Sequence, residues 1–321
     1  MSMAGVRWAK GHGTENDFVL VLDEDGTLEI TPDEVAAICD RRAGIGGDGL
    51  IRVTRQTDPE RDPAAAPDDP DTAGLWFMDY RNSDGSFAEM CGNGIRVFAA
   101  YLLHAGLLSL ADGESVRVIT RSGVKTVRRE GDRFAADLGA WRVDAAEQNL
   151  QASPAGQSAG SAGPAGRTVR LPRSPSLTGL TGLSVDVGNP HVVVELARLD
   201  QLQGADLSVP PTVEPPSVGG TNVEFAVIDR APGGDIPPDA GHVVMRVHER
   251  GSGETRSCGT GAVAVALAAG YRSGPDGPRR WIVDVPGGRL EVRQPGGSRV
   301  HGSSAELIGP AVIVAEGELL G

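Results

Sequence analysis

The chain has 321 residues, 40% of them apolar, so it is long enough to bury a sizeable core and is expected to form two domains. Its formal net charge of −13 argues against a nucleic-acid backbone or an anionic membrane as partner, because both attract clustered Lys and Arg. No apolar run reaches the roughly 18 residues of a membrane span, and no signal peptide is recognisable. A soluble cytoplasmic protein that acts on a small molecule is therefore expected.

The cysteine and histidine patterns argue against a disulfide framework and a metal site. The chain has three cysteines, an odd number, and no Cys-x-x-Cys pair. Its six histidines are scattered and none has a metal-ligand spacing. Reduced thiols and no bound metal are expected.

The first part of the chain predicts a glycine-bearing turn at residues 10–18 that leads into a short apolar strand. Asn16 lies at this turn, where a purely conformational role and a binding role are both open. Residues 31–42 predict a helix with a capping threonine and a proline in its first turn. The glycine-rich segment 44–49 lacks the order of a nucleotide-binding loop.

The middle of the chain contains two segments with little apolar content. Residues 55–74 carry six acidic residues and four prolines and predict a solvated surface loop. Strands are predicted at 75–80 and between 115 and 138. Residues 145–167 are rich in Ala, Gly, Ser and Pro, which is typical of a flexible linker. The predicted domains are 1–147 and 168–321, joined by a linker at 148–167.

The second half predicts many short strands. A strand ends in a polar turn at 188–191 and resumes, and another strand follows a turn at 220–222. A Pro/Gly-rich insertion at 231–241 precedes further short strands, which lie on both sides of the segment that contains Cys258. Each half therefore combines short strands with one apolar helix, which the sheet must wrap to cover.

Two cysteines share the local pattern Cys-Gly-x-Gly followed by an apolar helix. Every side chain from 262 to 269, just after Cys258, is apolar, which predicts a helix buried on all sides. Cys91 precedes a similar apolar segment, so the two form an internal repeat. A thiol at a helix start faces unpaired N–H groups and is expected to ionise. Cys39, on a predicted helix, is interpreted as a core residue.

A matched pair of thiols suggests acid–base chemistry on opposite faces of one carbon. If both helix starts point at one cleft, an α-carboxylate can bind between them. One thiolate then removes the α-proton while the other thiol delivers a proton from the far side. The net result is inversion at carbon.

Ordered motifs spanning nearly the whole chain resemble those of diaminopimelate epimerase. Each fragment is modest alone, and their specificity comes from their number and order. The motifs are Asn16-Asp17-Phe18, Asn82-x-Asp84-Gly85-Ser86, Met90-Cys91-Gly92-Asn93-Gly94-Ile95-Arg96, Gly188-Asn189-Pro190-His191, Asn222-Val223 and Glu249-Arg250-Gly251-x-Gly253-Glu254-Thr255-x-x-Cys258-Gly259-x-Gly261.

The resemblance implies a fold of class α/β (α+β), with two pseudo-symmetric domains that each wrap a mixed or antiparallel sheet around a central helix. It implies a cofactor-independent isomerase that converts LL- into meso-diaminopimelate and feeds lysine and peptidoglycan biosynthesis. Cys91 and Cys258 would be its two bases. The expected partner is the small-molecule substrate, and a homodimer is one candidate assembly.

Further site residues follow from the resemblance position by position. Asn189 could instead be only a turn residue, and Glu249-Arg250 only a surface pair. Some family members carry a glutamine where this chain has Gly49, so Gly49 is left out of the site. The implied substrate-binding residues are Asn16, Asn82, Gly92, Asn93, Asn189, Asn222, Glu249, Arg250, Gly259 and Thr260, with His191 and Glu249 beside the cysteines.

Three other readings remain open. A proline or hydroxyproline racemase resembles the two-thiol arrangement, but its cyclic substrate would leave four asparagines and an arginine without a partner. A scaffold without thiol chemistry, as in phenazine-biosynthesis relatives, would not be expected to keep both cysteines. A thiol peroxidase or cysteine hydrolase lacks a triad around the thiols.

Overall fold

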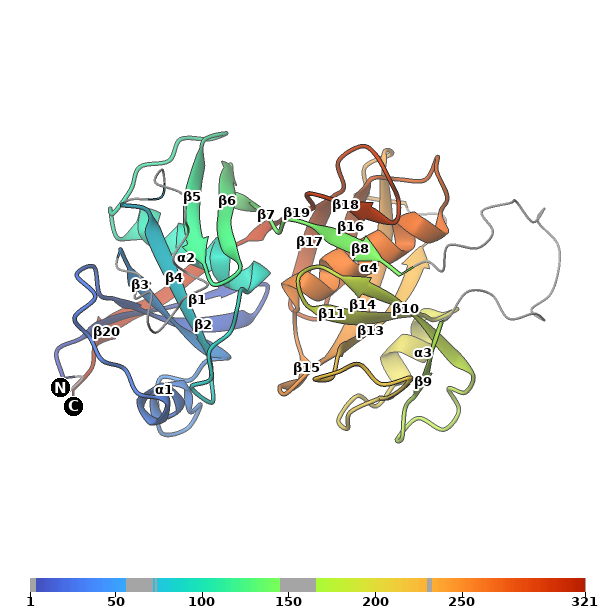
Figure 1. Cartoon of the computed structure of the whole chain (residues 1–321), viewed down its shortest axis with the longest axis horizontal. Helices are drawn as coiled ribbons and strands as arrows, with labels where there is room; N and C mark the ends of the chain where they lie inside the picture. Colours follow the sequence, from blue (N-terminus) through green and yellow to red (C-terminus); the bar gives the residue numbers. More distant parts are fainter. Residues whose placement is uncertain (1–3, 56–71, 73, 145–165, 230–232, 321) are drawn as a thin grey trace.

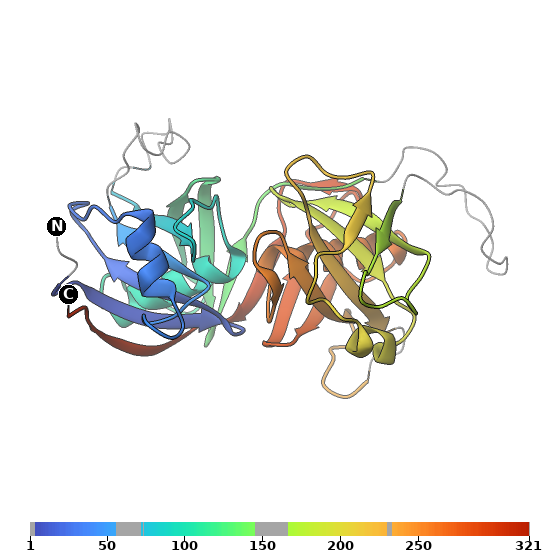
Figure 2. The ribbon, with the colours of Figure 1, turned by 90° about the horizontal axis from the view of Figure 1, so that it is seen from below.

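The computed structural model describes residues 4–55, 72, 74–144, 166–229 and 233–320. Two lobes lie side by side along the long axis, and each contains one central helix (Figure 1). The first and last described strands run next to each other in the first lobe (Figure 2).

The first lobe is built around α2 (Gly92–His104), a helix whose first eight residues are all buried. Ten of its 13 residues are buried, so strands must cover it on several sides. The lobe also contains α1 (Pro32–Cys39), β1 (Arg7–Gly13), β2 (Asn16–Leu22), β3 (Gly49–Thr54), β4 (Trp76–Asn82), β5 (Ser115–Thr120), β6 (Gly123–Glu130), β7 (Arg133–Asp137) and β20 (Val312–Glu318).

The second lobe is built around α4 (Gly259–Arg272), which is buried from its first residue to Gly270. This confirms the helix predicted from the apolar run after Cys258. The lobe also contains α3 (Leu199–Gly204), β8 (Trp141–Val143), β9 (Arg167–Arg170), β10 (Leu180–Asp186), β11 (Pro190–Glu195), β12 (Thr212–Glu214), β13 (Asn222–Asp229), β14 (Ala240–Glu249), β15 (Gly253–Thr255), β16 (Arg280–Val285), β17 (Gly288–Arg293), β18 (His301–Gly302) and β19 (Glu306–Pro310).

The two lobes repeat one order of strand pairings. In the first lobe β1 and β2 are antiparallel, β2 and β3 parallel, β3 and β4 antiparallel, β4 and β5 parallel, and β5 and β6 antiparallel. Strands β10, β11, β13, β14, β16 and β17 repeat these directions in the same order. Helices α2 and α4 each follow the fourth strand of their set. The predicted fold class and internal repeat are confirmed.

Hydrogen bonding continues from one lobe into the other. Strand β19 pairs with β17 on one side and with β7 on the other, and β20 then pairs with β1, so the chain returns to the first lobe. Strand β8 already pairs with β10 and β18 in the second lobe. The chain therefore crosses at residues 138–140, earlier than the predicted boundary at 147. We propose that the chain forms two domains and that it passes from the first to the second at this crossing point.

Several sequence-predicted segments fall partly outside the described residues. These are most of the surface loop at 55–74, all but the last two residues of the linker at 148–167, and the start of the insertion at 231–241. In the described parts of the chain, no helix has the length and apolar character needed to cross a membrane.

Helix α1 is shorter than predicted. Its start has the expected capping box, in which Thr31 and Glu34 bond each other's backbone N–H. It ends at Cys39 rather than at 42, because the Asp40 carboxylate accepts the N–H groups of Arg42 and Ala43, both at 2.7 Å. These bonds favour a turn over another helical residue.

Candidate active site

Cys91 and Cys258 occupy the same position on the two buried helices. Each is the N-cap residue, with φ −131° at Cys91 and −119° at Cys258. Each sulfur accepts the backbone N–H three residues later, at 3.4 Å from Gly94 and 3.3 Å from Gly261. The thiols therefore sit where helix N–H groups are unpaired and the dipole is positive.

The two helix starts abut each other. A Cβ placed on Gly259 would lie 2.9 Å from Asn93 N and 3.1 Å from the carbonyl carbon of Gly92. Leu307 of β19 packs against both glycines, with its Cδ2 2.9 Å from either added Cβ. Only glycine permits this approach, so both N-termini converge on one place between the lobes.

Side-chain hydrogen bonds tie the lobes together at this place. Asn93 Nδ2 donates to Ser257 Oγ at 3.1 Å and to Asn16 Oδ1 at 3.2 Å. The Ser257 hydroxyl also shares a 2.6 Å hydrogen bond with Thr14 Oγ1. Thr14 and Glu15 form the β1–β2 turn with φ +52° and +62°, a conformation unusual for a β-branched residue. The hairpin tip is thus held against the second lobe.

On the side of Cys91, a polar chain runs outward through Asn16. Cys91 Sγ donates to Asn16 Oδ1 at 3.6 Å, and Asn16 Nδ2 donates to Asp48 Oδ2 at 2.7 Å. Arg41 contacts the other oxygen of Asp48 at 2.7 Å. Burial raises the pKa of Asp48. Asn16 is therefore fixed with its carbonyl oxygen toward the thiol.

On the side of Cys258, three predicted residues gather. The Glu249 carboxylate interacts with the Cys258 thiol, and burial raises the pKa of Glu249. Thr260 Oγ1 lies 3.5 Å from the sulfur and accepts from Asn189 Nδ2 at 3.4 Å. His191 Nε2 lies 3.0 Å from Asn189 Oδ1. His191 and Glu249 therefore both lie in the half of the site that contains Cys258.

The thiols are not primed to ionise in this conformation. Burial raises the pKa of Cys91 to about 11 and that of Cys258 well above its ordinary value, and the negative charge of Glu249 raises both further. The helix N–H groups act in the opposite direction but are outweighed. The predicted lowering of the pKa is wrong here, because the sequence does not reveal how deeply the sulfur atoms are enclosed.

Most remaining candidates come in pairs at equivalent strand ends of the two repeats. Equivalence follows from the register of the strands. Phe18 of β2 pairs with Gly49 of β3 in the first repeat, and His191 of β11 pairs with Asn222 of β13 in the second. Gly49 in turn pairs with Asn82, and Val223 pairs with His248, the residue before Glu249. The resulting pairs are Asn16 with Asn189, Gly49 with Asn222, and Asn82 with Glu249.

Gly49 has no room for a side chain. A Cβ there would lie 2.4 Å from Arg81 O and 2.7 Å from Tyr80 Cε2. The Tyr80 ring fills this space, and its hydroxyl donates to Asn82 Oδ1 at 3.2 Å. Asn82 also donates to Ser86 at 3.0 Å. Tyr80 thus holds Asn82 in place.

The Arg250 guanidinium is not gathered with the thiols. It is exposed and donates to Gly219 O at 3.1 Å, whereas its backbone N–H donates to Asn222 Oδ1 at 2.9 Å. Asn222 is buried. Arg250 lies at the rim of the site in this conformation.

Sequence reasoning missed several residues of the site. Thr14 and Ser257 carried no signal, because only the fold brings the hairpin tip to the start of α4. Glu224 did carry one: it is an acidic residue flanked by the apolar side chains of Val223 and Phe225 in strand β13, and it is fully buried. Among the described residues, no group of three His, Cys, Asp or Glu side chains is arranged to hold a metal ion.

Comparison with known proteins gives one family. A family model described as "Diaminopimelate epimerase" matches residues 8–142 and 183–311. Diaminopimelate epimerase of Streptomyces coelicolor is 46% identical, covering 98% of this chain and 95% of the relative, and that of Thermobifida fusca is 43% identical, covering 98% of each. A PhzF-family phenazine biosynthesis protein from Bacillus anthracis matches in fold, with a TM-score of 0.61, 16% identity and coverage of 98% and 99%.

Proposed function

The chain belongs to the diaminopimelate epimerase family, and from this premise we propose that it interconverts LL- and meso-2,6-diaminopimelate for lysine biosynthesis. The reaction inverts one α-carbon. It needs a base on one face of that carbon and an acid on the other, and no electron transfer.

The observation that carries the proposed mechanism is the pair of N-cap thiols at abutting helix starts. An α-carboxylate bound at these N-termini meets free N–H groups and two positive dipole ends, which also stabilise the charge that develops when the α-proton leaves. One cysteine, as thiolate, takes that proton, and the other, as thiol, delivers its own from the opposite face. The roles of Cys91 and Cys258 are exchanged after each turnover.

A proton must leave one of the raised-pKa thiols before this step. Glu249 is placed to accept it, because its carboxylate interacts with Cys258 and its own pKa is raised by burial. A raised pKa makes Glu249 a stronger base, which favours its acceptance of the proton. Free, reduced cysteines suit a cytoplasmic setting, which we also propose.

The remaining polar residues of the site suit the distal end of the substrate, which carries a second ammonium group and a second carboxylate. Asn amides accept from an ammonium group and donate to a carboxylate, and Arg250 can bind a carboxylate in a bidentate fork once it turns inward. Proline, the substrate of the rival reading, has no such distal end.

Solvent exchange separates the two substrates. Wild-type enzyme is incubated in D₂O with LL-diaminopimelate and, in parallel, with L-proline, and the α-carbons are followed by NMR and mass spectrometry. We expect deuterium in inverted diaminopimelate and none in proline. Exchange into proline at a comparable rate would overturn the proposed substrate.

A further inference from the structure

Glu224 is a fully buried carboxylate that the mechanism above does not use. It lies on β13 two residues after Asn222, and Asn222 pairs with His191 on the neighbouring strand β11. Side chains two residues apart on a strand share a face, so Glu224 and His191 are diagonal neighbours. A Cβ on Gly261 would lie 2.8 Å from Glu224 Oε1, which places this face against the first turn of α4.

His191 contacts an oxygen atom through each of its ring nitrogens. Nδ1 lies 2.6 Å from Glu224 Oε1 and Nε2 lies 3.0 Å from Asn189 Oδ1, so both ring nitrogens face oxygen acceptors. With Glu224 as a carboxylate, each nitrogen would donate a hydrogen bond, an arrangement that corresponds to the imidazolium form. Both side chains of the Glu224–His191 pair are 0% exposed. In the described structure Glu224 Oε2 has no hydrogen-bond partner, and Oε1 bonds to His191.

The hydrogen bonds continue from His191 through Asn189 and Thr260 to the thiol of Cys258. Asn189 accepts from His191 through Oδ1 and donates through Nδ2 to Thr260 Oγ1 at 3.4 Å. The Thr260 oxygen thereby accepts from Asn189, and its hydroxyl hydrogen is available to Cys258 Sγ, which lies 3.5 Å away. A chain of five contacting side chains therefore ends at Cys258 and consists of Glu224, His191, Asn189, Thr260 and Cys258.

We propose that Glu224 is a positioning residue: by holding His191 as an imidazolium, it orients the Asn189 amide so that the Thr260 hydroxyl donates to Cys258. The inference rests on the proposed role of Cys258 as an acid and base. A hydroxyl donor stabilises the thiolate at a sulfur that also faces the carboxylates of Glu224 and Glu249 and the N–H of Gly261. Glu224 thus acts on the reaction without touching substrate.

The first test observes His191 directly. The six histidines are labelled with ¹⁵N, and the His191 signal is assigned by its loss in His191→Gln. At pH 7.5 both ring nitrogens should be protonated in wild type, and one should lose its proton in Glu224→Gln. His242, held between Asp229 at 3.2 Å and Asp284 at 2.9 Å, should be unchanged in that variant. A neutral His191 in wild type would overturn the proposal.

The second test follows the thiols without substrate, so its outcome does not depend on the proposed activity. Iodoacetamide alkylation of Cys91 and Cys258 is measured between pH 7 and 10 by peptide mass spectrometry. In Glu224→Gln, alkylation of Cys258 at pH 8 should fall about tenfold, the effect of one charge-assisted hydrogen bond, while Cys91 keeps its rate. Asp229→Asn, which removes a carboxylate–histidine contact from the same strand, should change neither rate.

A double variant tests whether the effect passes through Thr260. Once Thr260→Val has cut the chain, adding Glu224→Gln should not slow Cys258 further. Faster alkylation of Cys258 in Glu224→Gln would mean that Glu224 acts as a repelling charge. An equal change at both thiols would mean a loosened fold. Either result contradicts the positioning role.

Discussion

At the scale of the residue, each thiol experiences two opposing influences. The N–H groups of a helix start favour the thiolate, whereas enclosure by protein favours the neutral thiol. Enclosure prevails in this structure, where it raises the pKa of both thiols. Proton transfer to a neighbouring group then becomes part of the reaction.

This balance predicts how Cys91 reacts with iodoacetamide. Because its pKa is raised to about 11, the alkylation rate should climb roughly tenfold per pH unit from pH 8 to 10 and level off only near pH 11. Peptide mapping over a pH series measures it. A plateau already reached at pH 8 would show that the helix start outweighs burial.

A second prediction at this scale concerns the role of Arg250 in substrate specificity. A substrate without the distal carboxylate leaves buried polar groups unpaired, which can lower kcat/KM roughly 10⁴-fold. Lysine should therefore be a very poor substrate, and Arg250→Lys should lose much of the activity on diaminopimelate, because a point ammonium cannot reproduce the planar fork. Comparable wild-type kcat/KM on lysine, or an unaffected variant, would remove Arg250 from this role.

The site was predictable where its residues form local patterns. Cys91 and Cys258 stood out because the residues after each one spell out a helix start. Thr14 and Ser257 are 243 positions apart in the chain, and nothing local to either predicts their contact. The raised pKa of the thiols likewise depends on enclosure by distant strands.

At the scale of the element, an apolar helix was predictable and its surroundings were not. Eight consecutive apolar side chains in α4 leave no face for water, which determines burial. Which strands supply that cover depends on long-range pairing, such as β19 with β7, that no local pattern encodes. Strands of two or three residues, such as β18 and β12, are too short to leave a periodic pattern.

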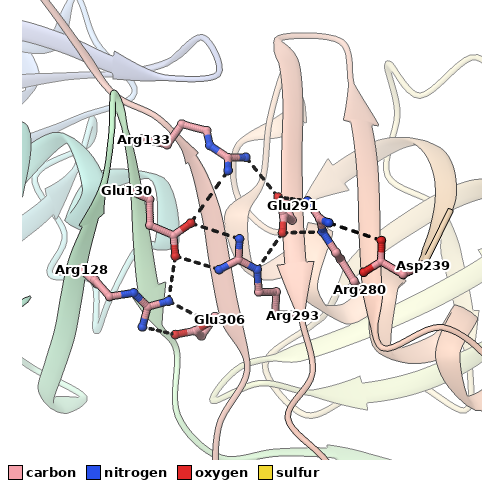
Figure 3. A network of polar contacts seen from close by, with 8 residues as sticks. All are labelled: Arg128, Glu130, Arg133, Asp239, Arg280, Glu291, Arg293 and Glu306. Atoms are coloured by element: carbon pink, nitrogen blue, oxygen red, sulfur yellow. Dashed lines mark hydrogen bonds and ion pairs between the residues drawn. The ribbon is translucent and has the colours of Figure 1, made fainter. Parts of the chain in front are cut away.

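Strands β6, β7, β16, β17 and β19 share a network of ion pairs where the lobes join (Figure 3). At its centre, the nearly buried Glu291 accepts from Arg293 at 2.7 Å, Arg280 at 2.8 Å and Arg133 at 3.1 Å. Glu291→Gln leaves these arginines short of one charge and should lower the free energy of unfolding by about 3 kcal/mol. Urea denaturation measures the loss. The exposed pair Arg7–Glu318 provides the control, and Glu318→Gln should change nothing measurable.

The same network predicts sensitivity to acid. Against the opposing effect of burial, hydrogen bonds from Arg280 and Arg293 lower the pKa of Glu291, and Arg293 with Arg128 lowers that of Glu130 to about 2. A depressed carboxyl pKa adds stability that is complete above its ordinary value of 4.5 and is lost as the pH falls toward 2. The stability gap between wild type and Glu291→Gln should therefore shrink as the pH falls below 4.5. A gap that stays constant over this range would exclude an electrostatic origin.

At the scale of the whole molecule, the two lobes bring together two helix starts that are 167 residues apart between Gly92 and Gly259. Their backbones touch, so the cysteines that precede them are expected to reach disulfide distance. Mild peroxide should inactivate the enzyme and form a Cys91–Cys258 crosslink that dithiothreitol reverses, whereas Cys39, buried at the end of α1, should stay out of it. Mass spectrometry that finds only separately capped sulfurs would show that the thiols do not share a site.

The central claim is that both lobes supply one thiol each to opposite faces of one α-carbon. The most direct measurement is epimerisation of LL-diaminopimelate in D₂O by wild type, Cys91→Ala and Cys258→Ala, with Cys39→Ala as the matched control. Wild type and Cys39→Ala should give meso product with one solvent deuterium at the inverted carbon, and each of the other variants should lose about 10³-fold or more of this rate. Inversion by Cys91→Ala or Cys258→Ala at a rate near that of wild type would contradict the claim.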